Sequence, residues 1–272
     1  MPFVEANGIR LYYETEGKGE PLLLITGIGY PLWYWHRLAP LLAEHFRVIT
    51  FDNRGVGQSD APPGPYSAQM MAADTAGLLD ALGLKRAHIL GHSMGGFIAQ
   101  ALVLDYPQRV DRLILASTNF GGPRQIPPSP EAMAVLTNVT GDPTERFMRG
   151  LKVSTAPGFA EQNQDFVREW LEYRLQNPID PVAYQAQLGV GLGLLSAESA
   201  FDGRLAQITA PTLLLWGEHD ATVPPANADL IAAQIPNSTV TILLGAGHHL
   251  PIEVPQSAAQ AIIGFLSGSH QA

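Results

Sequence analysis

One segment of the sequence has the residue types of a nucleophile for acyl transfer: Gly-His-Ser-Met-Gly-Gly at 91–96. It follows a short apolar run at 88–90 and precedes an apolar stretch of helical character from Phe97. A serine hydroxyl reacts well only when it is exposed and has a base beside it, and a sharp strand-to-helix turn exposes it. Such a turn crowds the backbone, so it needs glycines two residues before and after the serine. The pattern predicts that Ser93 is a nucleophile; the alternative is a glycine-rich turn that only packs.

Short apolar runs recur along the chain and predict the strands that would position this turn. They are apolar on both faces, which is typical of a parallel sheet covered on each side. Helical stretches such as 67–82, which stops at Gly83, lie between them and predict βαβ units with right-handed crossovers. A hairpin is expected at 3–6 and 10–15, around the tight turn Asn7-Gly8. The expected strands of the sheet are 22–26, 47–51, 88–90, 113–116, 212–216 and 240–244.

The alternation of strand and helix is interrupted in the middle of the chain. This part opens with a proline-rich stretch at 123–130 and then becomes helical in character. It is far longer than an ordinary crossover connection. We therefore interpret 122–205 as a helical cap inserted into a core formed by 1–121 and 206–272; a few ordinary crossover helices are the alternative.

With Ser93 in this setting, the sequence resembles the α/β-hydrolase superfamily, and within it the serine esterase and lactonase-like members with a small cap. The likeness covers nearly the whole chain and is weakest in 122–205. It implies an α/β fold with a mostly parallel central sheet of about eight strands, helices on both faces and a helical cap insertion. In this family the triad runs in the order serine, acid, histidine, with each residue on a loop at the carboxyl end of a strand.

The resemblance assigns the acid to the loop after the expected strand 212–216. Asp220 is the better candidate, because Glu218 lies closer to the strand end and is typical of a solvated loop residue. The family has an alternative acid position in the loop 117–119, but this loop holds no carboxylate here. Asp220 is therefore expected to orient the base.

The same resemblance assigns the base to the loop after the last strand. The family pattern is a glycine and the histidine, followed after a short run by a glutamate and a proline. His248, with Glu253 and Pro255 after it, fits this pattern, and His249 is the close rival. His92 adjoins the nucleophile, but neighbouring side chains diverge on such a turn, so we expect it to be packed or hydrogen-bonded in the core.

In the family, two backbone N–H groups form an oxyanion hole that stabilises the charge on the carbonyl oxygen as the serine adds. One belongs to the residue after the nucleophile, here Met94. The other comes from the loop after the strand 22–26, and we assign it to Ile28. The family often has His-Gly at the start of this loop, where this chain has Thr26-Gly27. Because the donor is a backbone group, this departure concerns the hydrogen bonds that support the loop.

Several aromatic residues are candidates for an apolar substrate pocket. Tyr30 and Trp33 closely follow the oxyanion loop, and Phe166 and Trp170 belong to the expected cap. Tyr30 and Trp33 suit a pocket or an ordinary core equally well, whereas Trp35 is expected in the core.

No cofactor or metal is expected. The segment Asp52 to Ser59 contains a G-x-G string but lacks the full dinucleotide fingerprint and a phosphate-binding Lys-Ser or Lys-Thr pair. In the family this segment is structural, and we interpret Asp52 and Arg54 as a brace for the loop. His248 and His249 are adjacent, and they lack the spacing of metal ligands on a helix.

The composition excludes several other classes of protein. The chain of 272 residues has 25 acidic and 16 basic side chains, a formal net charge of −9, and its acidic surface would repel nucleic acid. It has no cysteine, which excludes disulfides, thiolate ligands and a cysteine nucleophile. The N-terminus lacks the order of a signal peptide and no apolar run could cross a bilayer, so we expect a cytoplasmic protein without a membrane partner.

The triad candidates Ser93, Asp220 and His248, together with the family resemblance, predict a serine hydrolase. Its expected substrate is a small to medium, largely apolar carboxylic ester or lactone, cleaved through an acyl-enzyme with water as co-substrate. Epoxide hydrolases and haloalkane dehalogenases would need an aspartate in place of Ser93. Carbon–carbon bond hydrolysis, amide cleavage and cofactor-free perhydrolase or haloperoxidase activity can use the same triad and stay open. A receptor-like protein with little turnover also stays open, and a nitrophenyl-ester assay against Ser93→Ala would discriminate it.

Overall fold

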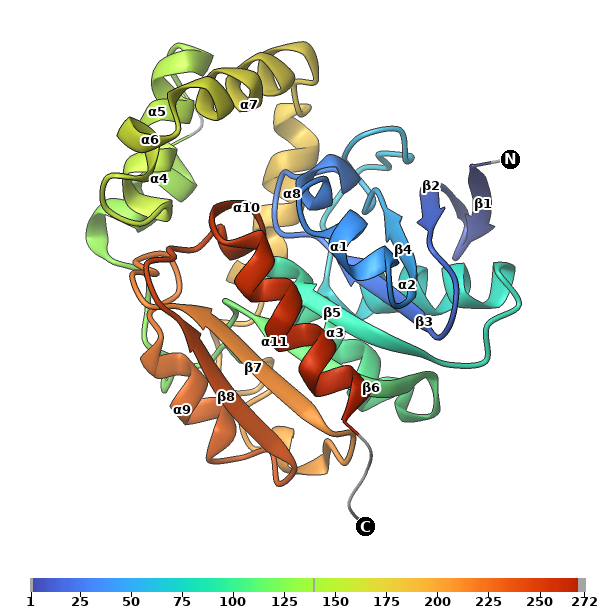
Figure 1. Cartoon of the computed structure of the whole chain (residues 1–272). Coiled ribbons are helices and arrows are strands. Elements are labelled where there is room, and N and C mark those ends of the chain that lie inside the picture. Colours follow the sequence, from blue (N-terminus) through green and yellow to red (C-terminus); the bar gives the residue numbers. More distant parts are fainter. Residues whose placement is uncertain (1, 139, 269–272) are drawn as a thin grey trace.

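The computed structural model describes residues 2–138 and 140–268, and its centre is an eight-stranded sheet of order β1-β2-β4-β3-β5-β6-β7-β8 (Figure 1). β2 pairs antiparallel with β1 and β4, and all the other neighbours pair parallel. This confirms the mostly parallel α/β sheet expected from the sequence. The strands are β1 (Phe3–Ala6), β2 (Ile9–Glu16), β3 (Pro21–Ile25), β4 (Arg47–Phe51), β5 (Ala87–His92), β6 (Val110–Ala116), β7 (Thr212–Gly217) and β8 (Ser238–Leu243).

The ends of the elements follow from local chemistry. Between β1 and β2, Asn7 and Gly8 have φ of 49° and 77°, the left-handed pair that a tight hairpin turn requires. Helix α2 (Ala68–Ala81) starts where the Ser67 side chain accepts a hydrogen bond from the Met70 N–H at 3.1 Å. It ends before Gly83, whose φ of 68° no continuing helix could adopt.

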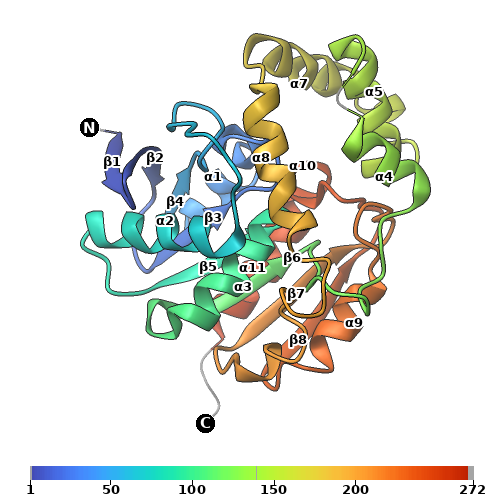
Figure 2. The same ribbon diagram turned by 180° about the vertical axis from the view of Figure 1, so that it is seen from behind.

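Helices cover both faces of the sheet (Figures 1 and 2). Along β3, Leu23 and Ile25 belong to the buried cluster under α2, α3 and α9, whereas Leu24 belongs to the cluster under α1 and α11. Complete burial of each such side chain contributes about 1.5–3 kcal/mol, which explains why both faces of β3 are apolar. These helices are α1 (Ala39–Ala43), α3 (Met94–Asp105), α9 (Ala226–Ala232) and α11 (Pro255–Ser267).

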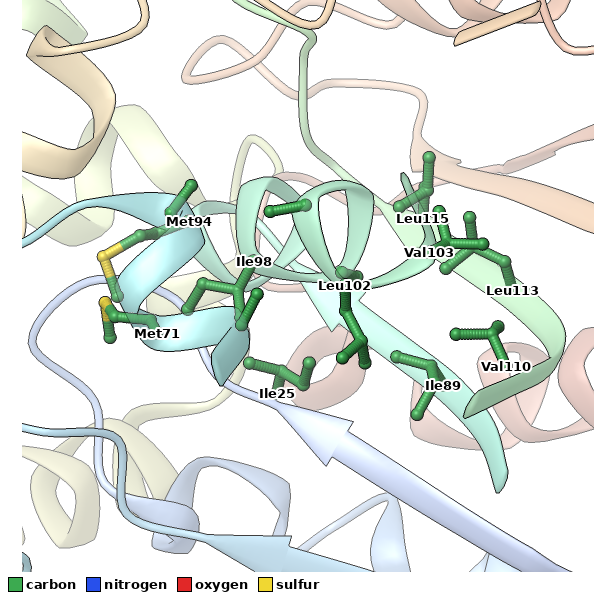
Figure 3. Close-up of a cluster of buried hydrophobic side chains, with 14 of the residues drawn as sticks. Ile25, Met71, Ile89, Met94, Ile98, Leu102, Val103, Val110, Leu113 and Leu115 are labelled. Carbon is green, nitrogen blue, oxygen red and sulfur yellow. The ribbon is translucent and has the colours of Figure 1, made fainter. Parts of the chain in front are cut away.

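Helix α3 is anchored firmly to the sheet from its first turns. Figure 3 shows Ile98 and Leu102 of this helix above Ile25 of β3 and Ile89 of β5. All four side chains are fully buried. The packing fixes the start of α3, and with it the turn that joins this helix to β5.

The long segment between β6 and β7 is helical, as expected for 122–205. In Figures 1 and 2, α4 to α7 gather beyond one end of the sheet, and α8 runs back toward the core, where it contacts α3. That these helices form a separate cap stays a prediction. The bounds are α4 (Pro130–Thr137), α5 (Pro143–Ser154), α6 (Phe159–Gln162), α7 (Gln164–Gln176) and α8 (Pro181–Leu192).

The remaining elements are short. One of them, α10, follows the loop after β8, and a 3-10 helix follows the loop after β3. They are η1 (Leu32–Trp35), η2 (Pro107–Arg109), η3 (Leu205–Gln207) and α10 (Leu250–Glu253). Across 2–138 and 140–268, no helix has the length and apolar character needed to cross a membrane.

Candidate active site

Ser93 occupies the sharp turn between β5 and α3. Its φ of 55° and ψ of −120° lie in a region that residues other than glycine rarely adopt. The flanking glycines are needed because the chain comes very close to itself. A Cβ on Gly91 would lie 2.3 Å from the Gly95 carbonyl oxygen, and one on Gly95 would lie 2.2 Å from the Ile25 carbonyl oxygen. The G-x-S-x-G pattern is thus explained by the geometry of this turn.

The loops that carry the three predicted triad residues meet at one edge of the sheet. Ser93 follows β5, Asp220 follows β7 and His248 follows β8, and these strands run parallel. The carboxyl ends of parallel strands lie at the same edge, where ligands of open α/β sheets bind. Ser93 and His248 line the same cavity.

His248 and Asp220 form a buried pair in which the Nδ1···Oδ2 distance is 2.9 Å. The second carboxylate oxygen of Asp220 accepts hydrogen bonds from the N–H groups of Thr222 at 2.9 Å and Val223 at 2.7 Å. These bonds fix the carboxylate. Because a carboxylate can only accept, Nδ1 of His248 carries the proton, and Nε2 is left with a lone pair that can accept one.

The rival acid and base are placed differently. Glu218 is exposed and accepts a hydrogen bond from the Gly245 N–H at 3.0 Å. Nδ1 of His249 lies 3.2 Å from the Tyr34 hydroxyl, and among the described residues no carboxylate is bonded to its ring. The structure therefore brings Asp220 to His248, and it brings neither rival into this pair.

A second, neutral histidine supports the loop of His248. The Nε2 atom of His92 donates to the His248 carbonyl oxygen at 2.8 Å, and the His92 side chain is almost completely buried, as expected. Burial lowers the pKa of His92 and of His249 well below its usual range, and the charge of His248 acts in the same direction. Both rings are therefore neutral near pH 7.

Glu253 ties this loop to the segment after α5. Its carboxylate accepts hydrogen bonds from the backbone N–H groups of Gly247 at 3.0 Å, His249 at 2.9 Å and Ala156 at 2.7 Å. Burial raises the pKa of Glu253, and these N–H groups oppose the increase. The two residues that flank His248 are thus held by one carboxylate.

The loop after β3 lies directly against the serine turn. A Cβ on Gly27 would lie 3.1 Å from Cβ of Ser93. In the part of the chain that the structure describes, the N–H groups of Ile28 and Met94 donate to no protein acceptor. The N–H of Gly29, by contrast, is bonded to the Gln187 side chain. Among the described residues, the N–H groups of Ile28 and Met94 are thus without a protein acceptor, and their role in an oxyanion hole stays a prediction.

Thr26 supports this loop at the position where the family often has histidine. Its hydroxyl donates to the Tyr30 carbonyl oxygen at 2.8 Å and spans the loop. The Asn53 side-chain amide donates to the Thr26 carbonyl oxygen at 3.2 Å. The threonine side chain therefore supplies a hydrogen bond that closes the loop.

A cavity of about 260 Å³ opens beside Ser93. Its walls come from the loop after β3, the loops that carry Ser93, Asp220 and His248, and the helices α4, α5, α7 and α8. Tyr30 lines it, as expected for a pocket residue. The remaining lining is mostly apolar and includes Leu136, Leu151 and Leu171.

The structure corrects the other three aromatic pocket predictions, because these side chains do not line the cavity beside Ser93. Trp170 is fully buried and packs edge-on against the ring of His249, with centroids 5.1 Å apart. Phe166 lies under the guanidinium of Arg37 and stacks with His36. Trp33 stacks on Tyr173 with centroids 4.1 Å apart and lines a separate cavity.

The segment after β4 has structural contacts. The Asp52 carboxylate accepts hydrogen bonds from the backbone N–H groups of Leu32 at 2.7 Å and Gln58 at 2.8 Å, and Arg54 pairs with Asp74. These contacts agree with the expected brace. Over 2–138 and 140–268, no group of three or more His, Asp or Glu side chains is arranged to hold a metal ion.

A family model described as alpha/beta hydrolase fold matches residues 20–255. The chain belongs to this family. One relative of this hydrolase is RutD of Azorhizobium caulinodans, whose name assigns it provisionally as a carbamate hydrolase; the two are 30% identical over 97% of this chain and 98% of the relative. Another is the 2-hydroxy-6-oxononadienedioate/2-hydroxy-6-oxononatrienedioate hydrolase 2 of Pseudomonas putida, 32% identical over 95% of this chain and 92% of the relative. A similar solved structure is a thermophilic esterase of Thermogutta terrifontis, with 29% identity, a TM-score of 0.82 and coverage of 98% of each chain.

Sequence reasoning missed two residues of this α/β hydrolase that hold the loop after β3. Gln187 of α8 accepts from the Gly29 N–H at 2.8 Å, and Arg174 of α7 donates to the Gly29 carbonyl oxygen at 2.5 Å. The φ of Gly29 is 72°, a value that favours glycine, and a Cβ at this position would lie 3.2 Å from the Tyr184 ring. The available signal was weak: Gln187 is a buried amide within the largely apolar stretch of α8.

Proposed function

We propose that this hydrolase cleaves a carboxylic ester or a lactone with Ser93 as nucleophile, His248 as general base and Asp220 as the residue that orients the base. The observation that carries the proposal is the buried 2.9 Å contact between Asp220 and His248 at the cavity that Ser93 lines. The positive φ of Ser93, typical of a nucleophile elbow, supports it further.

In the proposed acylation step, Oγ of Ser93 attacks the carbonyl carbon while Nε2 of His248 accepts its proton. Asp220 stabilises the resulting imidazolium, and the N–H groups of Ile28 and Met94 stabilise the oxyanion. The imidazolium then gives its proton to the leaving alkoxide, which departs as the alcohol. In a lactone, which is a cyclic ester, the alcohol stays attached to the acyl group.

Water completes the proposed cycle. His248 takes a proton from a water molecule, the hydroxide adds to the acyl carbonyl and the bond to Ser93 breaks. The serine recovers its proton from the imidazolium, and the carboxylic acid leaves. No redox step or electron carrier is needed.

The helices between 122 and 205 act in this proposal as a cap that sets substrate size. They provide much of the cavity wall, whereas Ser93, Asp220 and His248 all come from outside this segment. A volume of about 260 Å³ suits a small substrate. We therefore expect short acyl or alcohol groups to be preferred.

Turnover of nitrophenyl esters of graded acyl length tests the proposal. The wild type should release nitrophenol from short-chain esters, and Ser93→Ala should not. An organophosphonate should label Ser93 alone in peptide mapping, because only an activated serine attacks it readily. Equal rates for wild type and Ser93→Ala, or a label at another residue, would refute the assignment.

A second candidate is hydrolysis of a carbon–carbon bond on the same residues. The 32% identity to a 2-hydroxy-6-oxononadienedioate/2-hydroxy-6-oxononatrienedioate hydrolase supports this second candidate. That substrate should be assayed beside the esters at equal enzyme concentration. A kcat/KM for it that exceeds the value for every ester and lactone would replace ester hydrolysis as the proposed reaction.

A further inference from the structure

The cavity beside Ser93 has the opposite charge to the chain as a whole. The sequence has 25 acidic and 16 basic side chains. The described residues that line the cavity nevertheless include Arg146, Arg149 and Arg174 and not one aspartate or glutamate. A cleft lined by charge of one sign concentrates ligands of the other sign, so this cavity favours anions.

The three arginines differ in how far their charge is neutralised. Arg149 is paired with Glu145, the previous turn of α5, at 3.7 Å. Among the described residues, neither Arg146 nor Arg174 forms an ion pair with a carboxylate. These two side chains are also only partly exposed, so water screens their charge incompletely.

Arg174 is fixed next to the proposed oxyanion loop. Its guanidinium donates to the Gly29 carbonyl oxygen and lies over the Tyr30 ring, 4.9 Å from the centroid. A guanidinium has five N–H donors, and the contact with Gly29 takes only one of its nitrogens. The side chain is therefore anchored at one nitrogen and has donors left for a ligand.

Arg146 lines the same cavity from α5. Both arginines act on Tyr184, which lines the cavity: burial raises the pKa of its hydroxyl, and the charges of Arg174 and Arg146 oppose the increase. The Tyr184 hydroxyl donates to the Leu136 carbonyl oxygen at 3.1 Å, and its ring lies against Gly29. The two cations thus line the cavity from different helices, and both act on Tyr184.

We propose that the substrate carries a free carboxylate in addition to the bond that is cleaved, and that Arg146 and Arg174 bind this carboxylate. This inference rests on the proposed function. Guanidinium groups match the planar geometry of a carboxylate and bind it with charge-assisted hydrogen bonds. The small cavity limits such a substrate to a short half-ester, or to a lactone with a carboxylate substituent.

Half-esters and their neutral analogues provide the test. The substrates are the monomethyl esters of succinic, glutaric and adipic acid, each beside the analogue in which a carboxamide replaces the free carboxylate. The two members of a pair have nearly the same shape and differ in charge. A pH-stat measures kcat/KM from the release of acid. For at least one chain length we expect kcat/KM to be about tenfold or more higher for the carboxylate than for the carboxamide. This factor corresponds to the free energy that one hydrogen bond to a charged group contributes.

Two variants and one control locate the preference. Arg146→Gln should reduce the carboxylate-to-carboxamide ratio by about tenfold, and Arg146→Lys, which keeps the charge, should reduce it less. Arg168→Gln is the control, because Arg168 is exposed on α7, contacts Asp165 and does not line the cavity. Raising the salt from about 0.1 M to 1 M shortens the screening length from about 10 Å to 3 Å and should lower the wild-type ratio.

The outcomes separate this inference from the proposed function. A ratio near one in the wild type, or a ratio that Arg146→Gln and salt leave unchanged, overturns the inference while ester hydrolysis stands. Turnover of nitrophenyl esters without turnover of any half-ester also overturns it. If neither nitrophenyl esters nor half-esters are cleaved and Ser93 resists the organophosphonate, the proposed function itself fails.

Discussion

The side-chain oxygen of Gln187 accepts a hydrogen bond from the backbone N–H of Gly29 at 2.8 Å, and its amide nitrogen donates to the carbonyl oxygen of Arg54 at the same distance. Gln187 lies on α8 and is 1% exposed. One residue of the proposed cap therefore holds the loop that presents Ile28. Because the Gly29 N–H is taken, it cannot compete with Ile28 for a ligand.

Replacing Gln187 tests this relationship. Gln187→Leu would leave the Gly29 N–H and the Arg54 carbonyl buried without partners, at a cost of about 1–3 kcal/mol for each group. We expect the free energy of unfolding to fall. We also expect kcat to fall more than KM rises, because the proposed oxyanion donor, the Ile28 N–H, stabilises the transition state only when its loop is held in position. Gln185→Leu is the control, since Gln185 is exposed on the same helix. Equal kcat values for the two variants would show that Gln187 only packs.

The choice between His248 and His249 follows from their partners. His248→Ala should lower kcat by about 10⁴–10⁶, because members of a triad act as a unit. His249→Ala should retain far more activity, since the ring of His249 contacts Tyr34 and Trp170 and no carboxylate. Nitrophenyl-ester kinetics of both variants, each checked for folding by circular dichroism, decide the matter. A His248→Ala variant within about tenfold of wild type would contradict the assignment.

Asp220→Asn tests the orienting residue. The amide keeps the volume, but it can donate to Nδ1 of His248 and so favours the tautomer with the proton on Nε2, which cannot act as a base. We expect kcat to fall by about 10⁴ with little change in fold. Glu218→Gln, a change in an exposed side chain of the same loop, should stay near wild type. The reverse pattern of activities would assign the acid role to Glu218.

The central strands could be predicted because burial on both faces leaves a direct trace in the sequence. At the edge of the sheet β8 also forms an apolar run, but its Val240 and Ile242 are exposed and not covered as expected. Leu22 to Ile25 are fully buried and read as one apolar run, and the matching run at Thr212 to Trp216 is also buried. The turn at Ser93 could be predicted because only glycine fits where a Cβ would meet a carbonyl oxygen. Each of these constraints acts on residues that are close together in the chain.

The cavity wall could not be predicted, because it depends on how the helices of 122–205 lie on the core. Helical periodicity indicates which face of α7 is apolar, but not whether that face meets a cavity or another side chain. Trp170 and Leu171 are neighbours on α7; the first is fully buried and the second lines the cavity. Arg146 and Arg174 face that cavity from different helices, a juxtaposition that no local pattern in the sequence reveals.

Glu253 offers a test of how the His248 loop is held. Glu253→Gln keeps the side-chain volume but turns one acceptor into a donor that faces backbone N–H groups. Hydrogen bonds to charged groups contribute about 1.5–3 kcal/mol each, so we expect a loss of at least this size in the free energy of unfolding. Turnover should also fall, because Gly247 and His249 flank His248. Urea unfolding and kcat are measured together, with the exposed Glu172→Gln as the control; an unchanged stability would contradict the role.

The neutral rings of His92 and His249 predict that the protein loses stability in mild acid. In the unfolded chain a histidine binds a proton as the pH falls through about 6.5. In the folded protein burial lowers the pKa of both residues well below that value, so they stay neutral. The unfolded state therefore binds more protons below about pH 6.5, and the free energy of unfolding falls with the pH by up to about 1.4 kcal/mol per pH unit for each histidine.

Urea unfolding between about pH 7.5 and pH 5 measures this slope. His92→Gln should make it shallower, because the glutamine amide can take the place of Nε2 and donate to the His248 carbonyl oxygen, and it does not titrate. His45→Gln is the control, because the His45 side chain is exposed and the same change of residue type is made there outside the core. If His92→Gln and wild type lose stability in parallel as the pH falls, burial of a neutral His92 is not what makes the protein sensitive to acid.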